Sequence, residues 1–236
     1  MLRSCLAAIL ALALVGCGAP QPRAVGPIVD PARAEIEFQA RSAAQRMVDV
    51  TTRIEATAET VCRERAPSLN CDLEFLIDAN PRALPNAFQT VARDGRPLIV
   101  ITASLVVEAR NADELAFILA HEAAHHIEGH IDRQRRNARL GAVIMAQKAG
   151  LAPDPRSLRE AVAFGAAVGA RTYAKDFELE ADRLGTIITA QAGYDPLRGA
   201  EFFFRIPDPG NVFLGTHPPN ADRVKAVTET AARLPR

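Results

Sequence analysis

Residues 111–130 read NADELAFILAHEAAHHIEGH, a stretch in which apolar residues recur at helical spacing. Asn111 and Glu114 match a capping box, in which each side chain accepts a hydrogen bond from the backbone N–H of the other residue. We therefore predict that a central helix begins after Asn111 and continues to about His130.

One face of this helix carries metal-binding residue types. Residues four apart share a helix face, so His121 and His125 can offer two imidazoles to a single ion, with Glu122 beside them. A catalytic zinc needs a third protein ligand and keeps its fourth position for a water, whose lowered pKa makes hydroxide available near neutral pH. Glu122 is then expected to take the proton of that water and to deliver it to a leaving amine.

Two further histidines follow the first pair at a different spacing. His126 follows His121 by five positions and His130 follows His125 by five, which turns both away from the zinc-facing stripe of a continuous helix. We expect neither to bind the metal. His130 is expected to pack or to form a structural hydrogen bond, and His126 to be a solvent-side or second-layer residue.

The third ligand is expected in the helical segment Glu178-Leu179-Glu180-Ala181-Asp182. Glu178 and Asp182 are four apart and share a face, so Glu178 can bind metal while Asp182 orients a histidine ligand. Glu180 points away from that face, and we expect it to be a solvated surface acid.

These two segments together resemble the gluzincin family that includes HtpX-type heat-shock proteases, CAAX prenyl proteases and periplasmic BepA-type lipoproteins. In that family the Glu that opens E-x-x-A-D is the third zinc ligand, which here is Glu178. The resemblance spans about residues 75–230. It implies an α+β, mainly helical metallopeptidase domain with a small β-sheet beside the zinc-binding helix, and one zinc per chain.

Segments before the central helix extend the resemblance. Asn86-Ala87-Phe88 resembles the family's segment that precedes a strand, and residues 98–102 (LIVIT) resemble the edge strand above the zinc. Such a strand can pair with an extended substrate through backbone hydrogen bonds, which suits a protease that selects unfolded chains. A plain buried strand is the alternative.

The C-terminal part also resembles the family. Gly193-Tyr194-Asp195-Pro196 is similar to its turn after the third-ligand helix, and Thr216-His217-Pro218 with Arg223 is similar to its H-P-x-x-x-x-R element. The resemblance implies that His217 approaches the metal, either to stabilise the oxyanion of the tetrahedral intermediate or to cap zinc as a reversible fourth ligand. Arg223 would hold this element in place by pairing with an acid such as Asp182.

The first residues have the pattern of an export signal. Arg3 precedes an apolar run at residues 6–15 that is too short to span a bilayer comfortably, and residues 14–17 (LVGC) look like a bacterial lipobox. We expect residues 1–16 to be a lipoprotein signal peptide and Cys17 to be the lipidated N-terminus of the mature chain. The alternatives are an ordinary signal peptide with an incidental Cys, and an uncleaved membrane anchor.

The segment after the lipobox is rich in Pro and Gly, so we expect residues 17–31 to be a flexible tether and residues 32–236 to form a single domain. Gly18, directly after the predicted lipidated Cys, resembles Gram-negative lipoproteins of the outer membrane. We therefore expect a lipid anchor in the outer membrane and a domain in the periplasm.

Two cysteines, Cys62 and Cys71, remain in the predicted mature chain. An exported protein meets an oxidising compartment, so we expect them to form a disulfide. Their spacing does not suit a cysteine zinc site. Two free buried thiols are the alternative, because spacing does not reveal geometry.

The remaining secondary structure is read from periodicity and breaker residues. Helical patterns cover about residues 32–65, 138–149, 155–169, 172–192, 196–204 and 220–234, and β-branched runs mark strands at residues 73–77 and 98–101.

Composition limits the range of partners. The 236 residues are 48% hydrophobic, which suffices for one good-sized core, and 28 Lys and Arg balance 28 Asp and Glu. Aromatic residues are sparse and Trp is absent. Nothing in this balance indicates a nucleic-acid partner.

These features predict a zinc metalloendopeptidase that hydrolyses unfolded, misfolded or misassembled envelope proteins. The resemblance also makes the outer-membrane assembly machinery a candidate partner. The alternative is a latent or non-catalytic, zinc-stabilised chaperone or binding lipoprotein, which would share every one of these motifs.

Overall fold

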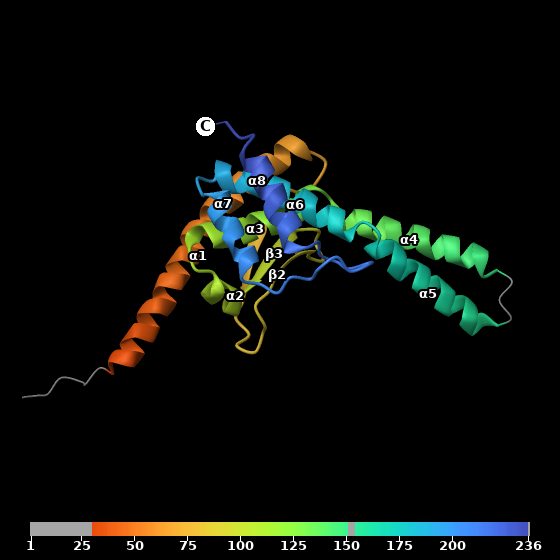
Figure 1. The fold of residues 1–236 in the computed structure, drawn as a ribbon, viewed down its shortest axis with the longest axis horizontal. Coiled ribbons are helices and arrows are strands. Elements are labelled where there is room, and N and C mark those ends of the chain that lie inside the picture. Colours follow the sequence, from red (N-terminus) through yellow and green to blue (C-terminus); the bar gives the residue numbers. More distant parts are fainter. Residues whose placement is uncertain (1–29, 151–153, 236) are drawn as a thin grey trace, which may run out of the picture.

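The computed structural model describes residues 30–150 and 154–235 (Figure 1). The predicted signal peptide, the lipobox Cys17 and most of the predicted tether therefore lie outside the described residues. No helix within the described ranges is long and apolar enough to cross a membrane.

The long helix α1 (Pro31–Arg65) begins with an Asp30 cap, and Pro31 fills the first turn, where its missing N–H costs nothing. The N-terminal part of α1 projects away from the rest of the described chain (Figure 1). Its C-terminal part enters the core, where Val50, Ile54 and Ala58 are buried.

A three-stranded sheet follows, with strand order β1-β3-β2. Strand β3 (Pro97–Thr102) pairs in parallel with β1 (Glu74–Asp78) and antiparallel with β2 (Ala87–Val91). The expectation that residues 98–102 form an edge strand is therefore wrong. Burial explains the difference, because Ile99 and Ile101 are fully buried, as in a central strand.

The edge strand beside the predicted metal site is β2, which the sequence analysis did not assign as a strand. Asn86 directly precedes this strand, and Ala87 and Phe88 are its first two residues. Its half-exposed side chains and its flanks rich in Pro, Asn and Gly obscured the pattern of alternation.

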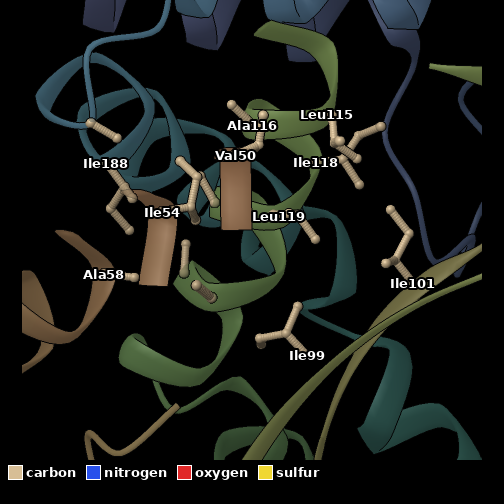
Figure 2. Packing of buried hydrophobic residues seen from close by; sticks show 14 of the residues in the cluster. Val50, Ile54, Ala58, Ile99, Ile101, Leu115, Ala116, Ile118, Leu119 and Ile188 are labelled. Carbon is tan, nitrogen blue, oxygen red and sulfur yellow. The ribbon is translucent and has the colours of Figure 1, made fainter. Parts of the chain in front are cut away.

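Helix α3 (Ala112–Ile127) runs through the centre of the fold and packs against α1, the sheet and helix α6 (Ala174–Gln191). Figure 2 shows the apolar contacts between α1, α3 and β3. Gly185 allows α6 to approach closely, because a Cβ there would lie only 3.1 Å from the backbone of His121. The remaining helical elements are α2 (Ala103–Glu108), α4 (His130–Lys148), α5 (Pro155–Arg171), α7 (Pro196–Gly199), the 3-10 helix η1 (Ala200–Phe204) and α8 (Asn220–Ala231).

Helix α3 ends at Ile127, three residues earlier than predicted, and α4 begins at His130. Gly129 separates them in the left-handed region, with φ of 65°, which a residue with a Cβ rarely adopts. The start of α3 agrees with the prediction for Asn111, whose side chain accepts from the backbone N–H of Glu114. The Glu114 carboxylate instead accepts from Arg110 N–H and pairs with Arg205.

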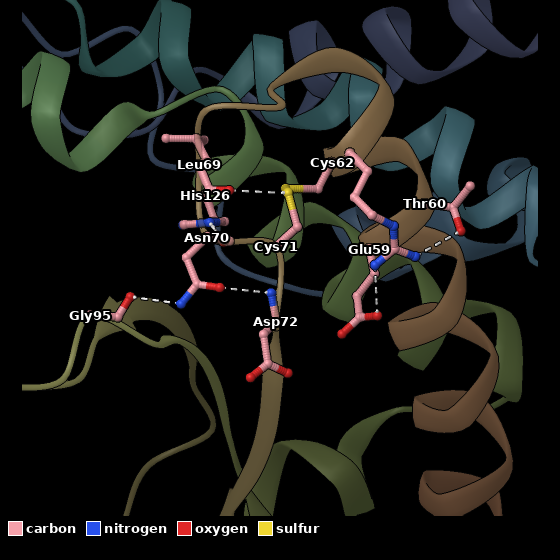
Figure 3. Close-up of a disulfide and its surroundings, with 10 residues drawn as sticks. Glu59, Thr60, Cys62, Leu69, Asn70, Cys71, Asp72, Gly95 and His126 are labelled. Atoms are coloured by element: carbon pink, nitrogen blue, oxygen red, sulfur yellow. Dashed lines mark hydrogen bonds and ion pairs between the residues drawn. A yellow bond between two sulfur atoms is a disulfide. The ribbon is translucent and has the colours of Figure 1, made fainter.

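The predicted disulfide between Cys62 and Cys71 is present in the structure, with a Cα–Cα distance of 5.7 Å (Figure 3). It joins the last turn of α1 to the segment that leads into β1. His126 Nε2 lies 2.7 Å from the backbone oxygen of Asn70 in the same loop. This contact ties the disulfide loop to the C-terminal turn of α3.

Helices α4 and α5 form an antiparallel hairpin that projects from the rest of the molecule (Figure 1). They pack mainly against each other, and their base lies where α3 ends and α6 begins.

Candidate metal centre

Three side chains from two helices converge at the centre of the fold. His121 and His125 of α3 and Glu178 of α6 offer ligand atoms that all lie within 4.8 Å of one another. His121 Nε2 lies 3.0 Å from His125 Nε2 and 3.6 Å from Glu178 Oε2, and His125 Nε2 lies 3.3 Å from Glu178 Oε1.

This triangle fits a tetrahedral zinc. Bonds of about 2.0–2.1 Å at tetrahedral angles separate neighbouring ligand atoms by roughly 3.3 Å. The three separations of 3.0, 3.3 and 3.6 Å scatter around that value, with the two histidines measured to different carboxylate oxygens of Glu178. Two imidazoles and one carboxylate are also the donor set of many catalytic zinc sites, so the residues present suit this ion.

The outer nitrogen of His121 has its own partner. Asp182 Oδ1 lies 2.9 Å from His121 Nδ1, and Asp182 is completely buried one turn after Glu178. Burial raises the pKa of Asp182, but hydrogen bonds from Arg223 and His121 outweigh it and hold the pKa below its usual range. The ionised Asp182 fixes His121 with its Nδ1 protonated and its Nε2 facing Glu178 and His125.

Arg223 of α8 completes this arrangement from behind. Its Nε and Nη2 donate to the two Asp182 oxygens at 2.8 and 2.7 Å, and its guanidinium lies 4.1 Å from the Phe203 ring centroid. The structure thus brings together the pair that the sequence analysis expected, Arg223 and Asp182. A two-pronged pair of this kind leaves little rotational freedom to either side chain.

The outer nitrogen of His125 also has a partner, which the sequence analysis did not foresee. His125 Nδ1 lies 2.7 Å from His130 Nδ1, and His130 Nε2 lies 3.1 Å from Glu180 Oε2. His130 is buried and stacks on Phe177, with ring centroids 4.6 Å apart. His130 therefore lies directly behind His125 and is not turned away from the site.

Glu180 is likewise not the solvated surface acid that was expected. Its carboxylate accepts from both terminal nitrogens of Arg133 and from His130. Hydrogen bonding by Arg133 is the largest influence on the pKa of Glu180, and it lowers that pKa against the effect of burial. The ionised Glu180 closes a chain of hydrogen bonds that begins at His125.

The hydrogen bonds that link His125, His130 and Glu180 all donate in the same direction, from His125 towards Glu180. Burial and the neighbouring His125 lower the pKa of His130 to about 4, although the hydrogen bond to Glu180 opposes them. A neutral His130 that donates from Nε2 to Glu180 must accept at Nδ1, so His125 Nδ1 donates to it. Nε2 of His125 is then left with a free lone pair, which points at the triangle.

The break between α3 and α4 explains why this contact was missed. The five-residue spacing from His125 to His130 excludes contact only if one helix continues through both residues. Gly129 ends that helix and redirects the chain. The Gly itself, one position before His130, was the available signal.

Glu122 lies on the wall of two adjoining cavities of about 210 and 670 Å³, both of which reach His125 and Glu178. The larger cavity runs from the edge strand β2 past Glu122 to Arg223. Its remaining wall is largely apolar and includes Phe88, Leu105, Phe117, Ile118, Phe202, Phe203 and Ile206. Glu122 thus lines a space large enough for a peptide segment, beside the three converging ligand atoms.

His217 approaches the centre from the loop between η1 and α8. Its Nδ1 lies 3.1 Å from Glu178 Oε2, and 57% of its side chain is exposed. The imidazole therefore borders both Glu178 and the larger cavity.

Comparison with known sequences agrees with this geometry. The sequence profile of Peptidase family M48 matches residues 49–231. A Vibrio cholerae serotype O1 protein provisionally named a beta-barrel assembly-enhancing protease is 31% identical over 152 residues, which are 58% of this chain and 31% of that protein.

Two further relatives carry the same name. The beta-barrel assembly-enhancing proteases of Escherichia coli O157:H7 and Shigella flexneri are each 29% identical over 140 residues, which are 51% of this chain and 28% of each relative. The similarity therefore spans less than a third of the length of these relatives.

Proposed function

The chain belongs to peptidase family M48, and from this premise we propose that it is a zinc-dependent endopeptidase whose metal is held by His121, His125 and Glu178. One observation carries the proposal. The three ligand atoms converge, with separations suited to tetrahedral zinc, on a cavity that also contains the Glu122 carboxylate.

The chain's own side chains account for the remaining requirements of peptide hydrolysis. Zinc, when bound, supplies a Lewis acid and lowers the pKa of a water. Glu122 accepts the proton of the attacking water and passes it to the leaving amine. His217 donates a hydrogen bond to the oxyanion of the tetrahedral intermediate. Asp182 and Arg223 keep His121 in the tautomer that presents Nε2.

We also propose that the substrates are unfolded, misfolded or misassembled envelope proteins. Strand β2 forms an edge of the sheet and borders the cavity at Ala87 and Phe88, so an extended segment can pair with it through backbone hydrogen bonds. This pairing uses backbone groups and not substrate side chains. It therefore selects substrates that are unfolded and does not require a particular sequence. The names of the relatives support a role in β-barrel assembly, with the assembly machinery as a partner.

The cellular setting of the proposal rests on sequence. We propose that residues 1–16 are removed as a signal peptide, that Cys17 is lipidated, and that the domain faces the periplasm from the outer membrane. Mass measurement of the native N-terminus tests this, because an uncleaved Met1 would contradict it.

The direct test of the mechanism is Glu122→Gln. We expect this variant to retain one zinc per chain, since Glu122 is not among the converging ligands, and to lose casein cleavage by at least ~100-fold. Glu128→Gln, which removes a carboxylate at the end of the same helix, should cleave normally. Turnover at a similar rate in Glu122→Gln would show that another group is the base.

The contact between His217 and Glu178 favours a second candidate function, a latent peptidase or zinc-stabilised chaperone whose site is capped by this histidine. His217→Ala separates the two. A large fall in turnover supports a donor to the oxyanion, whereas a rise in turnover supports a cap that holds the site shut.

A further inference from the structure

Most of the hairpin of α4 and α5 has no role in the peptide hydrolysis proposed above. Only its first turn, with His130 and Arg133, takes part in the metal centre. Beyond that turn the two helices extend away from the rest of the molecule (Figure 1), over roughly 20–25 Å at 1.5 Å per residue.

The two helices are in backbone contact with each other. A Cβ at Gly165 would lie 2.3 Å from the backbone oxygen of Gly141, and a Cβ at Gly169 would lie 2.2 Å from that of Asn137. A side chain added at either glycine would clash with the facing backbone, and at Gly165 also with Met145 of α4. Several other large apolar side chains of the hairpin are exposed.

These side chains line an open groove of about 300 Å³ along the hairpin. Leu140 and Ile144 of α4 and Phe164 of α5 contribute to it, with 61%, 44% and 63% of each residue exposed. Its lining contains no charged residue. An exposed apolar surface of this kind on a projecting arm usually serves as a contact surface.

The hairpin is also basic, although the whole chain is neutral. Residues 130–173 contain eight Lys and Arg against three Asp and Glu, a net charge of +5, whereas the whole chain has 28 of each. Within the described parts of the chain, five of the eight have no carboxylate within 4.0 Å, namely Arg136, Arg139, Lys148, Arg159 and Arg171.

We propose that the α4–α5 hairpin binds an anionic phospholipid surface, with acyl chains against the Leu140–Phe164 groove and the unpaired basic side chains beside lipid phosphates. The hairpin combines an exposed apolar groove with a net positive charge, and these two features together are typical of helices that lie in the membrane interface. Neither helix is apolar enough to cross a bilayer, so the hairpin lies on the surface.

The groove suits lipid better than an extended peptide. Its walls are two helices whose backbone groups are bonded within each helix, so they offer no donors or acceptors to a strand. Acyl chains need none. A net charge of +5 further favours an anionic surface over an apolar face of a second copy, which would carry the same charge.

The absence of Trp from the sequence permits a position-specific test in the full chain. Phe164→Trp places a single fluorophore in the groove, and Phe204→Trp places one on η1, where Phe204 is 74% exposed. With vesicles containing phosphatidylglycerol, we expect a blue shift for Phe164→Trp and quenching by brominated lipids. Phe204→Trp should show neither, and any affinity from the N-terminal segment is common to both.

A charge-removal pair extends the test. Arg136→Gln with Arg139→Gln should weaken partitioning to anionic vesicles about 30-fold, at roughly 1 kcal/mol for each cation. Lys225→Gln on α8 with Arg233→Gln in the turn that follows it should leave partitioning unchanged. Vesicles of phosphatidylcholine alone should bind weakly.

Three outcomes would overturn the proposal. Equal fluorescence responses of Phe164→Trp and Phe204→Trp would show that the hairpin is not the part of the protein that contacts the membrane. A blue shift of Phe164→Trp without vesicles that grows with protein concentration would identify a second copy as the occupant. The same shift with casein alone would identify a polypeptide.

Discussion

At the scale of single residues, His130 is the partner of the outer nitrogen of His125, one of the proposed metal ligands. Its Nδ1 lies 2.7 Å from His125 Nδ1, and its Nε2 donates a hydrogen bond to the ionised Glu180. This arrangement leaves only Nε2 of His125 to bind a cation. Asp182 does the same for His121, so each histidine ligand has its own orienting partner.

Replacement of this partner should therefore weaken the metal site. We expect His130→Asn to lower zinc affinity by about 10–100-fold, measured by competition with a chelator, because His125 loses the group that fixes its tautomer and orientation. The matched control is His126→Asn, in the last turn of α3, because within the described residues the imidazole of His126 has its polar contact with the Asn70 backbone oxygen and not with the converging side chains. Equal zinc affinities in the two variants would contradict this role of His130.

Residue spacing paired two of the three converging side chains, but it did not show the partner of the outer nitrogen of His125. His121 and His125 could be paired from helical periodicity alone, whereas Glu178 depended on resemblance to a family, because periodicity does not show which distant helix packs opposite. Glu180 was misassigned as a solvated surface acid. His130 was correctly expected to pack or to form a structural hydrogen bond, but its contact with His125 was not predicted, because that contact requires the chain to turn at Gly129.

At the scale of elements, the hairpin depends on the absence of side chains at its helix crossing. Gly165→Ala would place a Cβ 2.3 Å from the Gly141 backbone oxygen and 2.5 Å from Met145 Cγ. We expect this variant to separate α4 from α5 and to speed amide hydrogen exchange along both helices, with zinc binding retained. Ala163→Ser, on the exposed side of α5, should exchange like the wild type. Unchanged exchange in Gly165→Ala would show that the crossing tolerates a methyl group.

The sheet shows which features of an element a sequence can predict. The apolar, β-branched run at residues 98–101 predicted a strand correctly, but it does not tell a central strand from an edge strand. That distinction depends on β2, whose half-exposed residues and breaker-rich flanks gave no clear alternation. The bounds of α1 and α5, which both begin at a Pro, were predicted to within two residues. The start of α4 was predicted at about residue 138 but lies at His130, directly after Gly129.

At the scale of the whole molecule, the fold class was predicted correctly as mainly helical α+β. The predicted disulfide adds a constraint that is independent of the core. Closure of the loop between Cys62 and Cys71, nine positions apart, should contribute about 2.5 kcal/mol to the free energy of unfolding. We expect Cys62→Ser with Cys71→Ser to lower the urea midpoint accordingly. A wild-type midpoint that does not respond to reducing agent would contradict this.

The projecting hairpin has a consequence for how this chain can be altered. Helices α3 and α6 carry all three converging ligands and pack directly on each other, while the hairpin between them touches the centre only through its first turn. Lengthening a connection of this kind costs little, about 0.6 kcal/mol for each doubling of loop length. The outer part of the arm is therefore a modular position. We expect that lengthening or shortening the hairpin, or inserting a reporter domain at its tip, leaves the three converging side chains in place. The length of the hairpin can then vary without a change in the peptidase site.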